Sequence, residues 1–238
     1  AQIVSEFTGG AFDVTVGPLV NLWGFGPDES AYEPPGNDTI TVAMQDIGYT
    51  KLNVDCTMPA LRKASPGVYV DLSAFAKGHA VDEVSELLDA RALQDYLVEI
   101  GGEMRMRGSN ARSEPWAIAI ETPDRSGRSV QTVLHLSDAA MATSGDYRNF
   151  FEHEGRFYSH TIDPRTGYPV THNGASVTVV ADTAAFADAA ATALLVLGPD
   201  AGMELAERES IAAYFLLRLG SEFEERTSSL FATRSLRK

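Results

Sequence analysis

Four short segments contain more Gly, Asp, Thr and His than folding alone requires: residues 10–15, 71–79, 159–167 and 187–192. In residues 10–15, glycine lets the backbone approach a ligand closely, and Asp13 can accept hydrogen bonds from a hydroxyl or a ring nitrogen. A glycine turn capped by the aspartate explains the same pattern without any function. Taken alone, this segment favours the turn.

Residues 71–79 lie where we expect a strand over residues 68–72 to lead into a helix. Backbone amides at the start of a helix commonly bind an anion, and Lys77 would add a positive charge there. In the competing interpretation, Asp71 or Ser73 caps the helix and Lys77 is solvated. The residues leave these two interpretations equally open.

In residues 159–167, His160 stands three residues before an Asp-Pro turn, which presents it rigidly. Because imidazole titrates near neutral pH, this residue is the best of the five histidines for proton transfer. A hydrogen-bonded sheet histidine is the structural alternative, and it is slightly favoured by the residues alone. His172 is the competing candidate base.

Asp188 and Thr192 are four residues apart, so they share one face of a helix expected over residues 184–197. Their oxygens can converge on a small hard cation such as Mg²⁺. Alanines surround the aspartate, and burying a carboxylate there costs several kcal/mol unless a cation or donors compensate. A carboxylate favoured by the helix dipole is the competing explanation.

The composition bounds the class of protein. The 238 residues carry 33 acidic and 19 basic side chains, a net charge of −14. The length suits one large domain or two small ones, and the charge argues against sequence-independent nucleic-acid binding. An acidic protein that binds a diphosphate needs a local cation. The single Cys56 excludes an intrachain disulfide, and we expect it to be a buried or half-buried apolar residue.

Expected strands outnumber expected helices and often follow one another directly, which predicts an α+β fold. We expect helices over residues 1–8, 39–48, 73–90, 184–197 and 201–208, and strands over 49–56, 68–72, 96–100, 116–120, 132–136, 156–162, 175–181 and 211–219. Loops are expected over 27–38 and 123–129. In the helix over 73–90, Val81, Val84, Leu87 and Leu88 form an apolar stripe.

Six motifs occur in one order, and together they resemble the ApbE family, the FAD:protein FMN transferases formerly described as thiamine-biosynthesis lipoproteins. The motifs are GAFDVTVGPLV with LWGFG (10–20, 22–26), DLS with AKG (71–73, 76–78), IGGE (100–103), ATSGDYRN (142–149), SHTIDP (159–164), and AD with Thr192 (187–188, 192). The resemblance covers nearly the whole chain. It implies a single T-fold-like α+β domain over residues 1–238, with a mostly antiparallel sheet and packed helices.

The resemblance also implies a reaction and its residues. FMN is transferred from FAD to a Thr or Ser hydroxyl of an acceptor protein, AMP is released, and Mg²⁺ bridges the diphosphate. In this hypothesis His160 takes the proton of the acceptor hydroxyl. The implied FAD contacts are Ala11, Phe12, Asp13, Asp71, Lys77 and Ile162, and the implied Mg²⁺ ligands are Asp188, Thr192 and the backbone carbonyl of Ala74. Many relatives have a second Asp where this chain has Ala191.

Two other functions fit the same residues: an Mg²⁺-dependent FAD pyrophosphatase that frees FMN and AMP, and a non-catalytic FAD-binding protein. The family further implies a periplasmic protein, or one on the outer face of a bacterial inner membrane, anchored by lipid through a segment that precedes Ala1. The acceptor would be a membrane redox subunit or an extracellular flavoprotein, and no nucleic-acid partner is expected.

Overall fold

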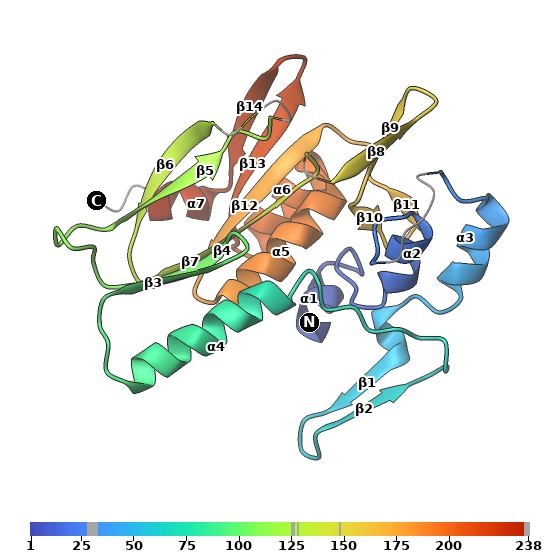
Figure 1. Cartoon of the computed structure of the whole chain (residues 1–238), viewed down its shortest axis with the longest axis horizontal. Coiled ribbons are helices and arrows are strands. Elements are labelled where there is room, and N and C mark those ends of the chain that lie inside the picture. The colour runs from blue at the N-terminus through green and yellow to red at the C-terminus, as the bar shows by residue number, and fades with distance from the viewer. Residues whose placement is uncertain (28–32, 125–126, 128, 148, 236–238) are drawn as a thin grey trace. The chain divides into compact units, whose positions relative to one another are not determined.

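The computed structural model divides the chain into two units, which are described separately (Figure 1). The first unit comprises residues 1–72 and 149–171, and the second comprises residues 73–148 and 172–238. The structure describes residues 1–27, 33–124, 127, 129–147 and 149–235. Parts of the two expected loops, and Arg148 of the ATSGDYRN motif, therefore lie outside the described residues. The expectation of a single domain stays a prediction.

A six-stranded antiparallel sheet organises the second unit, which confirms the α+β class. Its strand order is β14-β13-β12-β7-β4-β3. The strands are β3 (Tyr96–Ile100), β4 (Glu103–Arg107), β7 (Ala139–Gly145), β12 (Gly174–Ala181), β13 (Ala212–Leu219) and β14 (Glu222–Thr227). Of these, β4, β7 and β14 were not expected from the sequence. Every residue of β12 is buried, because both faces of the sheet are covered.

Alternating side chains divide the core of this unit into two layers. On one face Met141 and Val180 pack with a hairpin, β5 (Trp116–Glu121) and β6 (Val130–Leu136), and with α7 (Ser229–Ser235). On the other face Ala140 packs against α4 (Ala76–Ala90) and α5 (Ala184–Leu197). Helix α6 (Pro199–Arg208) packs against α5, and α4 and α5 lie side by side (Figure 1).

Short helices and three hairpins form the first unit. They are α1 (Gln2–Phe7), α2 (Gly17–Leu22), α3 (Asn37–Met44), the 3-10 turn η1 (Tyr49–Lys51), β1–β2 (Leu52–Asp55, Ala60–Lys63), β8–β9 (Phe150–His153, Arg156–Ser159) and β10–β11 (Ile162–Asp163, Tyr168–Pro169). Leu19, Trp23 and Phe151 lie in its core. The indole of Trp23 donates to the carbonyl of Gly167 at 2.8 Å, which fixes the turn after β10 to this core. No helix among the described residues of either unit is both long and apolar enough to cross a membrane.

Two strand expectations in this unit are wrong. Residues 68–72 form no strand, since no described segment pairs with them; the amide of Asp71 instead donates to the carbonyl of Val14 at 2.7 Å. The strand expected over residues 156–162 is interrupted after Ser159, whose hydroxyl accepts from the amide of Thr161 at 3.1 Å. A local pattern of alternation does not reveal whether a neighbouring strand exists.

The burial expectation for Cys56 is also wrong, and the apolar stripe of residues 73–90 does not coincide with the buried face of its helix. Cys56 is exposed in the turn between β1 and β2, because neither strand of this hairpin is covered there. In α4, Val84 and Leu87 of the apolar stripe are exposed, whereas Val81, Asp82 and other small residues face α5 and the sheet. Polar contacts of Asp82, and not apolar content alone, select the buried face of α4.

Asp82 joins α4 to the first turn of α5. Its two carboxylate oxygens accept from the backbone amides of Ala184 (2.9 Å) and Ala185 (2.8 Å), and Arg105 donates to the carboxylate at 3.0 Å. The amides at the start of a helix have no partner within the helix, so a buried carboxylate from α4 satisfies them. The contact fixes the direction in which α5 leaves the sheet.

We therefore expect Asp82→Ala to lower the free energy of unfolding by about 2–4 kcal/mol, since two buried amides and one guanidinium lose their acceptor. Urea unfolding followed by circular dichroism measures this change. The matched control is Glu83→Ala, one residue along and largely exposed, for which we expect less than about 0.5 kcal/mol. Equal effects of the two variants would contradict the capping role of Asp82.

Candidate functional site

Asp188 is a buried carboxylate in the second turn of α5. It is 3 % exposed, and Ala187, Ala189, Ala190 and Ala191 around it are fully buried. Its Oδ2 accepts from the backbone amide of a single described residue of α4, at 3.1 Å. Because burial disfavours the charged form, the pKa of Asp188 is raised above its ordinary value.

That amide belongs to Gly78, which brings the first turn of α4 against α5. A Cβ atom at Gly78 would lie 2.3 Å from the carbonyl oxygen of Ala184, a distance that no side chain tolerates. Glycine is therefore required for the two helices to approach closely enough for Gly78 to reach Asp188. Gly78 is the third residue of the AKG motif, so this close approach gives a structural reason for the glycine in that motif.

Lys77 and Glu103 form an ion pair beside this contact. Glu103 is 3 % exposed and lies at the start of β4, whereas the side chain of Lys77 is 44 % exposed. The second carboxylate oxygen of Glu103, Oε2, is buried and has no hydrogen-bond partner among the residues that the structure describes. Burial raises the pKa of Glu103 above its ordinary value, and the ammonium of Lys77 opposes that rise.

The charges of this group do not cancel. Lys77 also opposes the raised pKa of Asp188, and Asp188 contributes to the raised pKa of Glu103, so the three groups interact. One ammonium faces two buried carboxylates, which leaves a surplus charge of −1 when both are ionised. A cation bound nearby would relieve this surplus and stabilise the ionised carboxylates.

Thr192 and Ala74, the other two expected metal ligands, belong to the same unit as Asp188. Thr192 follows Asp188 by one helical turn, and its Oγ1 lies 3.0 Å from the Oγ of Ser144 on β7. Ala74 lies two residues before the first residue of α4. The described residues contain no group of three or more His, Cys, Asp or Glu side chains suited to a metal. The expected ligands are instead one carboxylate, one hydroxyl and one carbonyl, all of them hard oxygen donors.

His160 lies in the first unit, between β9 and β10. Its backbone amide donates to the carbonyl of Asn149 at 3.2 Å, and its ring Nδ1 is 2.8 Å from the same oxygen. Since a carbonyl only accepts, Nδ1 must carry the proton. The neutral ring then has its lone pair on Nε2, which is the atom that can accept a proton. The ring of Phe25 packs edge-on against the imidazole, with ring centres 6.2 Å apart.

His172, the competing candidate base, has both ring nitrogens engaged in the second unit. Its Nε2 is 2.8 Å from the carbonyl oxygen of Leu195, and its Nδ1 accepts from the amide of Gly174 at 3.1 Å. Burial lowers the pKa of His172 below its ordinary value, so the neutral form is favoured. These contacts identify His172 as a structural histidine that joins β12 to the end of α5.

The expected flavin contacts Ala11, Phe12 and Asp13 are buried in the first unit. Both oxygens of Asp13 are engaged: Oδ1 accepts from the amide and hydroxyl of Thr15 at 2.8 and 2.7 Å, and Oδ2 accepts from the amide of Tyr49 at 2.6 Å. The carboxylate thus organises its own turn, as the structural interpretation of this segment expects. A contact of these residues with flavin stays a prediction.

The two remaining expected flavin contacts of the first unit lie close to elements already described. The amide of Asp71 donates to the carbonyl of Val14, which brings Asp71 beside the segment 10–15. Ile162 is buried in β10, two residues after His160. The first unit therefore holds His160 and five of the six expected flavin contacts, whereas the second unit holds Lys77 and the three expected metal ligands.

The sequence assigns no role to Glu103, although this residue ends the IGGE motif. The available signal was an acidic residue that directly follows a Gly-Gly turn at the start of a strand. Its partner Lys77 is 26 residues earlier in the chain, so only the sheet and α4 together bring them into contact. The carbonyl of Asn149 accepts from the backbone amide and the ring Nδ1 of His160, and the sequence showed this residue only as the last position of the ATSGDYRN motif.

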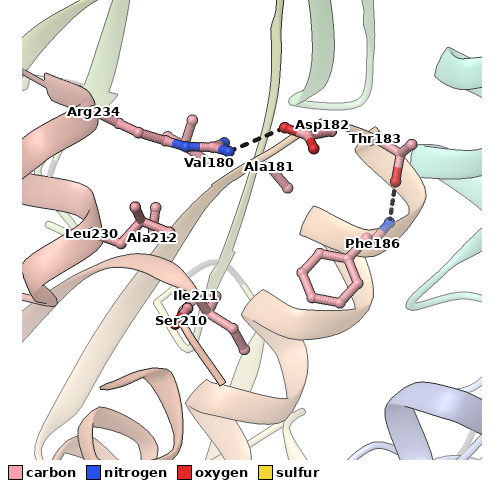
Figure 2. Close-up of a pocket in the computed structure, with 10 residues that line it drawn as sticks. All are labelled: Val180, Ala181, Asp182, Thr183, Phe186, Ser210, Ile211, Ala212, Leu230 and Arg234. Carbon is pink, nitrogen blue, oxygen red and sulfur yellow. Dashed lines mark hydrogen bonds and ion pairs between the residues drawn. The ribbon is translucent and has the colours of Figure 1, made fainter. Parts of the chain in front are cut away.

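A pocket of about 340 Å³ lies elsewhere in the second unit, at the ends of β12 and α5 (Figure 2). Phe186, Ile211 and Leu230 line it, and Arg234 pairs with Asp182 at 3.1 Å across it. None of the residues expected in the site contributes to its lining. The amides at the start of α5 are already bound by Asp82 and, for Phe186, by the hydroxyl of Thr183, as Figure 2 shows for the latter. This pocket is therefore not the candidate site.

Comparison with known proteins agrees with the fold and the motifs. The family model of the ApbE family matches residues 1–215. The chain is 46 % identical over 231 residues to the FAD:protein FMN transferase of Haemophilus influenzae, and 45 % identical over 228 residues to that of Vibrio cholerae. These alignments cover 96 % of this chain, and 67 % and 68 % of the two relatives.

Solved structures show the same similarity. The flavin transferase ApbE from Vibrio cholerae matches with a TM-score of 0.87 at 41 % identity, covering 98 % of this chain and 73 % of that one. The apo form of the Pseudomonas stutzeri flavinyl transferase ApbE matches with a TM-score of 0.88 at 41 % identity, covering 98 % and 72 %. The fold is thus the α+β fold of flavin transferases. The chain belongs to the ApbE family.

Proposed function

We propose that this chain transfers FMN from FAD to a Thr or Ser hydroxyl of an acceptor protein, with Mg²⁺ bound and with release of AMP. The observation that carries the proposal is the surplus negative charge of the buried Asp188–Lys77–Glu103 group beside oxygen ligands, in a chain similar to proteins named FAD:protein FMN transferase. Such a group suits a divalent cation, and the bound cation together with Lys77 would in turn suit a diphosphate.

Asp188, the hydroxyl of Thr192 and the carbonyl of Ala74 would hold the Mg²⁺. When bound, the metal would neutralise diphosphate charge and so favour departure of AMP. Lys77, whose ammonium interacts with Asp188, would add the protein's own positive charge. These residues explain how a chain with a net charge of −14 accommodates a dinucleotide.

His160 supplies the base in this proposal. Its Nε2 accepts the proton of the acceptor hydroxyl while the hydroxyl oxygen forms a bond to the FMN phosphorus. The bond between that phosphorus and the oxygen bridging to AMP breaks, and AMP leaves with the bridging oxygen. The carbonyl of Asn149 holds the ring by Nδ1, which keeps Nε2 in the form that accepts a proton. Positioning and charge account for the remaining rate enhancement.

The identity of the nucleophile separates this proposal from a pyrophosphatase, because water can use the same residues. The flavin contacts of Ala11, Phe12, Asp13, Asp71 and Ile162, and a location on the outer side of a bacterial inner membrane, belong to the proposal through the family resemblance alone.

The test is mass spectrometry of a candidate acceptor incubated with the protein, FAD and Mg²⁺. We expect the acceptor to gain one FMN through a phosphoester bond, to fluoresce after denaturing electrophoresis, and to yield one AMP per FMN transferred. Free FMN and AMP with unmodified acceptors would show a pyrophosphatase. FAD binding without AMP release would show a non-catalytic binding protein.

A further inference from the structure

We propose that Glu103 is a positioning residue, which holds the ammonium of Lys77 in place to receive the diphosphate of FAD. The inference rests on the proposed function, since it concerns how the second unit binds the same dinucleotide. It goes beyond the residues that the family resemblance implies, among which Glu103 has no role.

The first reason is that Glu103 is rigid where Lys77 is not. Glu103 pairs with Ile100 across the β3–β4 hairpin, and β4 is an inner strand that also pairs with β7. Lys77 extends a long, half-exposed side chain from the first turn of α4. A free lysine loses much rotamer freedom when it binds a ligand, so a buried anion that already orders the ammonium reduces this loss.

The second reason is the turn that covers the pair. Gly101 and Gly102 connect β3 to β4 with φ values of +65° and +105°, a conformation that favours glycine. A Cβ atom at Gly101 would lie 3.1 Å from Cδ of Lys77 and 3.5 Å from Oε2 of Glu103. The turn therefore packs against both side chains, and it restricts the positions that the lysine stem can take.

The third reason is energetic, because stability alone does not account for this ion pair. Within the described part of the chain, the buried Oε2 of Glu103 has no hydrogen-bond partner, and a buried carboxylate satisfied on one oxygen is costly. Replacing a buried ion pair by apolar side chains is often neutral or stabilising. Lys77 directly precedes Gly78, whose amide binds Asp188, so the pair instead sets a positive charge beside the expected metal ligand.

The test compares Glu103→Gln, which keeps the size and one acceptor oxygen, with Glu103→Met, which keeps only the size. FAD affinity is measured by isothermal titration calorimetry with EDTA present, so that no metal contributes. We expect Kd to rise about threefold in Glu103→Gln and about tenfold in Glu103→Met, the order of one charge-assisted hydrogen bond. In both variants Tm should stay equal or rise, because the half-exposed Lys77 can reach water.

Kinetics and a second substitution separate positioning from a general structural effect. In the transfer assay, the KM for FAD should rise while kcat at saturating FAD stays within about twofold. In a Lys77→Gln background, Glu103→Met should cause no further loss of affinity, since its effect passes through the lysine. The matched control is Glu99→Gln on β3, an exposed glutamate that should leave affinity unchanged.

Four results would overturn the inference. Affinity could be unchanged; binding could be tighter, as expected if Glu103 only repels the diphosphate; or the losses could add to those of Lys77→Gln. The fourth is a loss of affinity that follows a fall in Tm for both variants, since it would show a structural role. If the unsubstituted protein binds FAD and transfers FMN, and the Glu103 variants bind FAD with the same Kd, only the inference about Glu103 fails. If the unsubstituted protein binds no FAD, the proposed function fails with it.

Discussion

The His160→Ala variant is expected to lose FMN transfer by about 10²–10⁴-fold, the usual contribution of a positioned general base. FAD affinity should stay within about twofold. The carbonyl of Asn149 holds the imidazole through Nδ1, so in the proposed reaction the ring would act on the acceptor hydroxyl through Nε2. Removal of the ring leaves the hydroxyl without a proton acceptor and leaves the charged groups of the second unit unchanged.

The measurement is the initial rate of acceptor labelling at saturating FAD and Mg²⁺, combined with FAD binding by calorimetry. His135→Ala is the matched control, because this histidine is exposed on β6 in the second unit and should keep both activity and binding. His172→Ala should instead lower Tm, since two backbone groups lose their partners. Parallel losses of transfer and FAD affinity in His160→Ala would reject the base assignment.

Replacement of Asp188 by asparagine is expected to lower transfer by about 10²-fold or more, the scale of several kcal/mol that a bound divalent ion contributes to a transition state. Asparagine keeps the size and an oxygen that can accept from the amide of Gly78, so the contact between α4 and α5 survives. Residual activity should no longer respond to Mg²⁺ or to EDTA. Asp200→Asn, an exposed aspartate on α6, is the matched control.

Although Asp188→Asn should lower transfer, it should raise the stability of the metal-free protein. Burial raises the pKa of Asp188, so the folded protein holds this proton more tightly than the unfolded chain does. By linkage, the stability of the metal-free protein then falls as pH rises from the ordinary aspartate pKa, about 4, through the raised pKa of Asp188 in the folded protein. Above that window the buried charge remains a penalty, which asparagine removes.

Without metal at neutral pH, we therefore expect a higher Tm for Asp188→Asn than for the unsubstituted protein, by about 2–4 °C for each kcal/mol recovered. Mg²⁺ should raise the Tm of the unsubstituted protein and leave that of the variant unchanged. Calorimetry at several pH values with Mg²⁺ or EDTA measures both effects. An equal Mg²⁺ response in the two proteins would place the metal elsewhere.

The elements that the sequence predicts best are those with local signals at both ends. Helix α5 has the expected bounds, because Thr183 caps its first turn, an alanine-rich run follows, and Gly198 ends it with a φ of +80°. The strand expected over residues 68–72 shows the opposite case. Its alternation is real, but no strand in the described ranges pairs with it, and pairing depends on segments distant in the sequence.

The candidate site divides in the same way. The spacing of Asp188 and Thr192, the alanines around them and the turn after His160 are local signals. They name these residues as candidates, although each signal alone left a structural alternative open. The sequence preferred His160 to His172 as the base, but the backbone contacts that make His172 a structural histidine are visible only in the tertiary structure.

By itself the sequence determined the α+β class, the ApbE motifs and most of the residues with candidate chemistry, because these follow from residue type and short-range spacing. Only the tertiary structure decided which face of α4 is buried, that Asp82 caps α5, and that Glu103 pairs with Lys77. The contact of Glu103 with Lys77 and that of Asp82 with α5 each join residues more than 20 positions apart. Such contacts arise from the packing of helices on a sheet, which short-range periodicity does not encode.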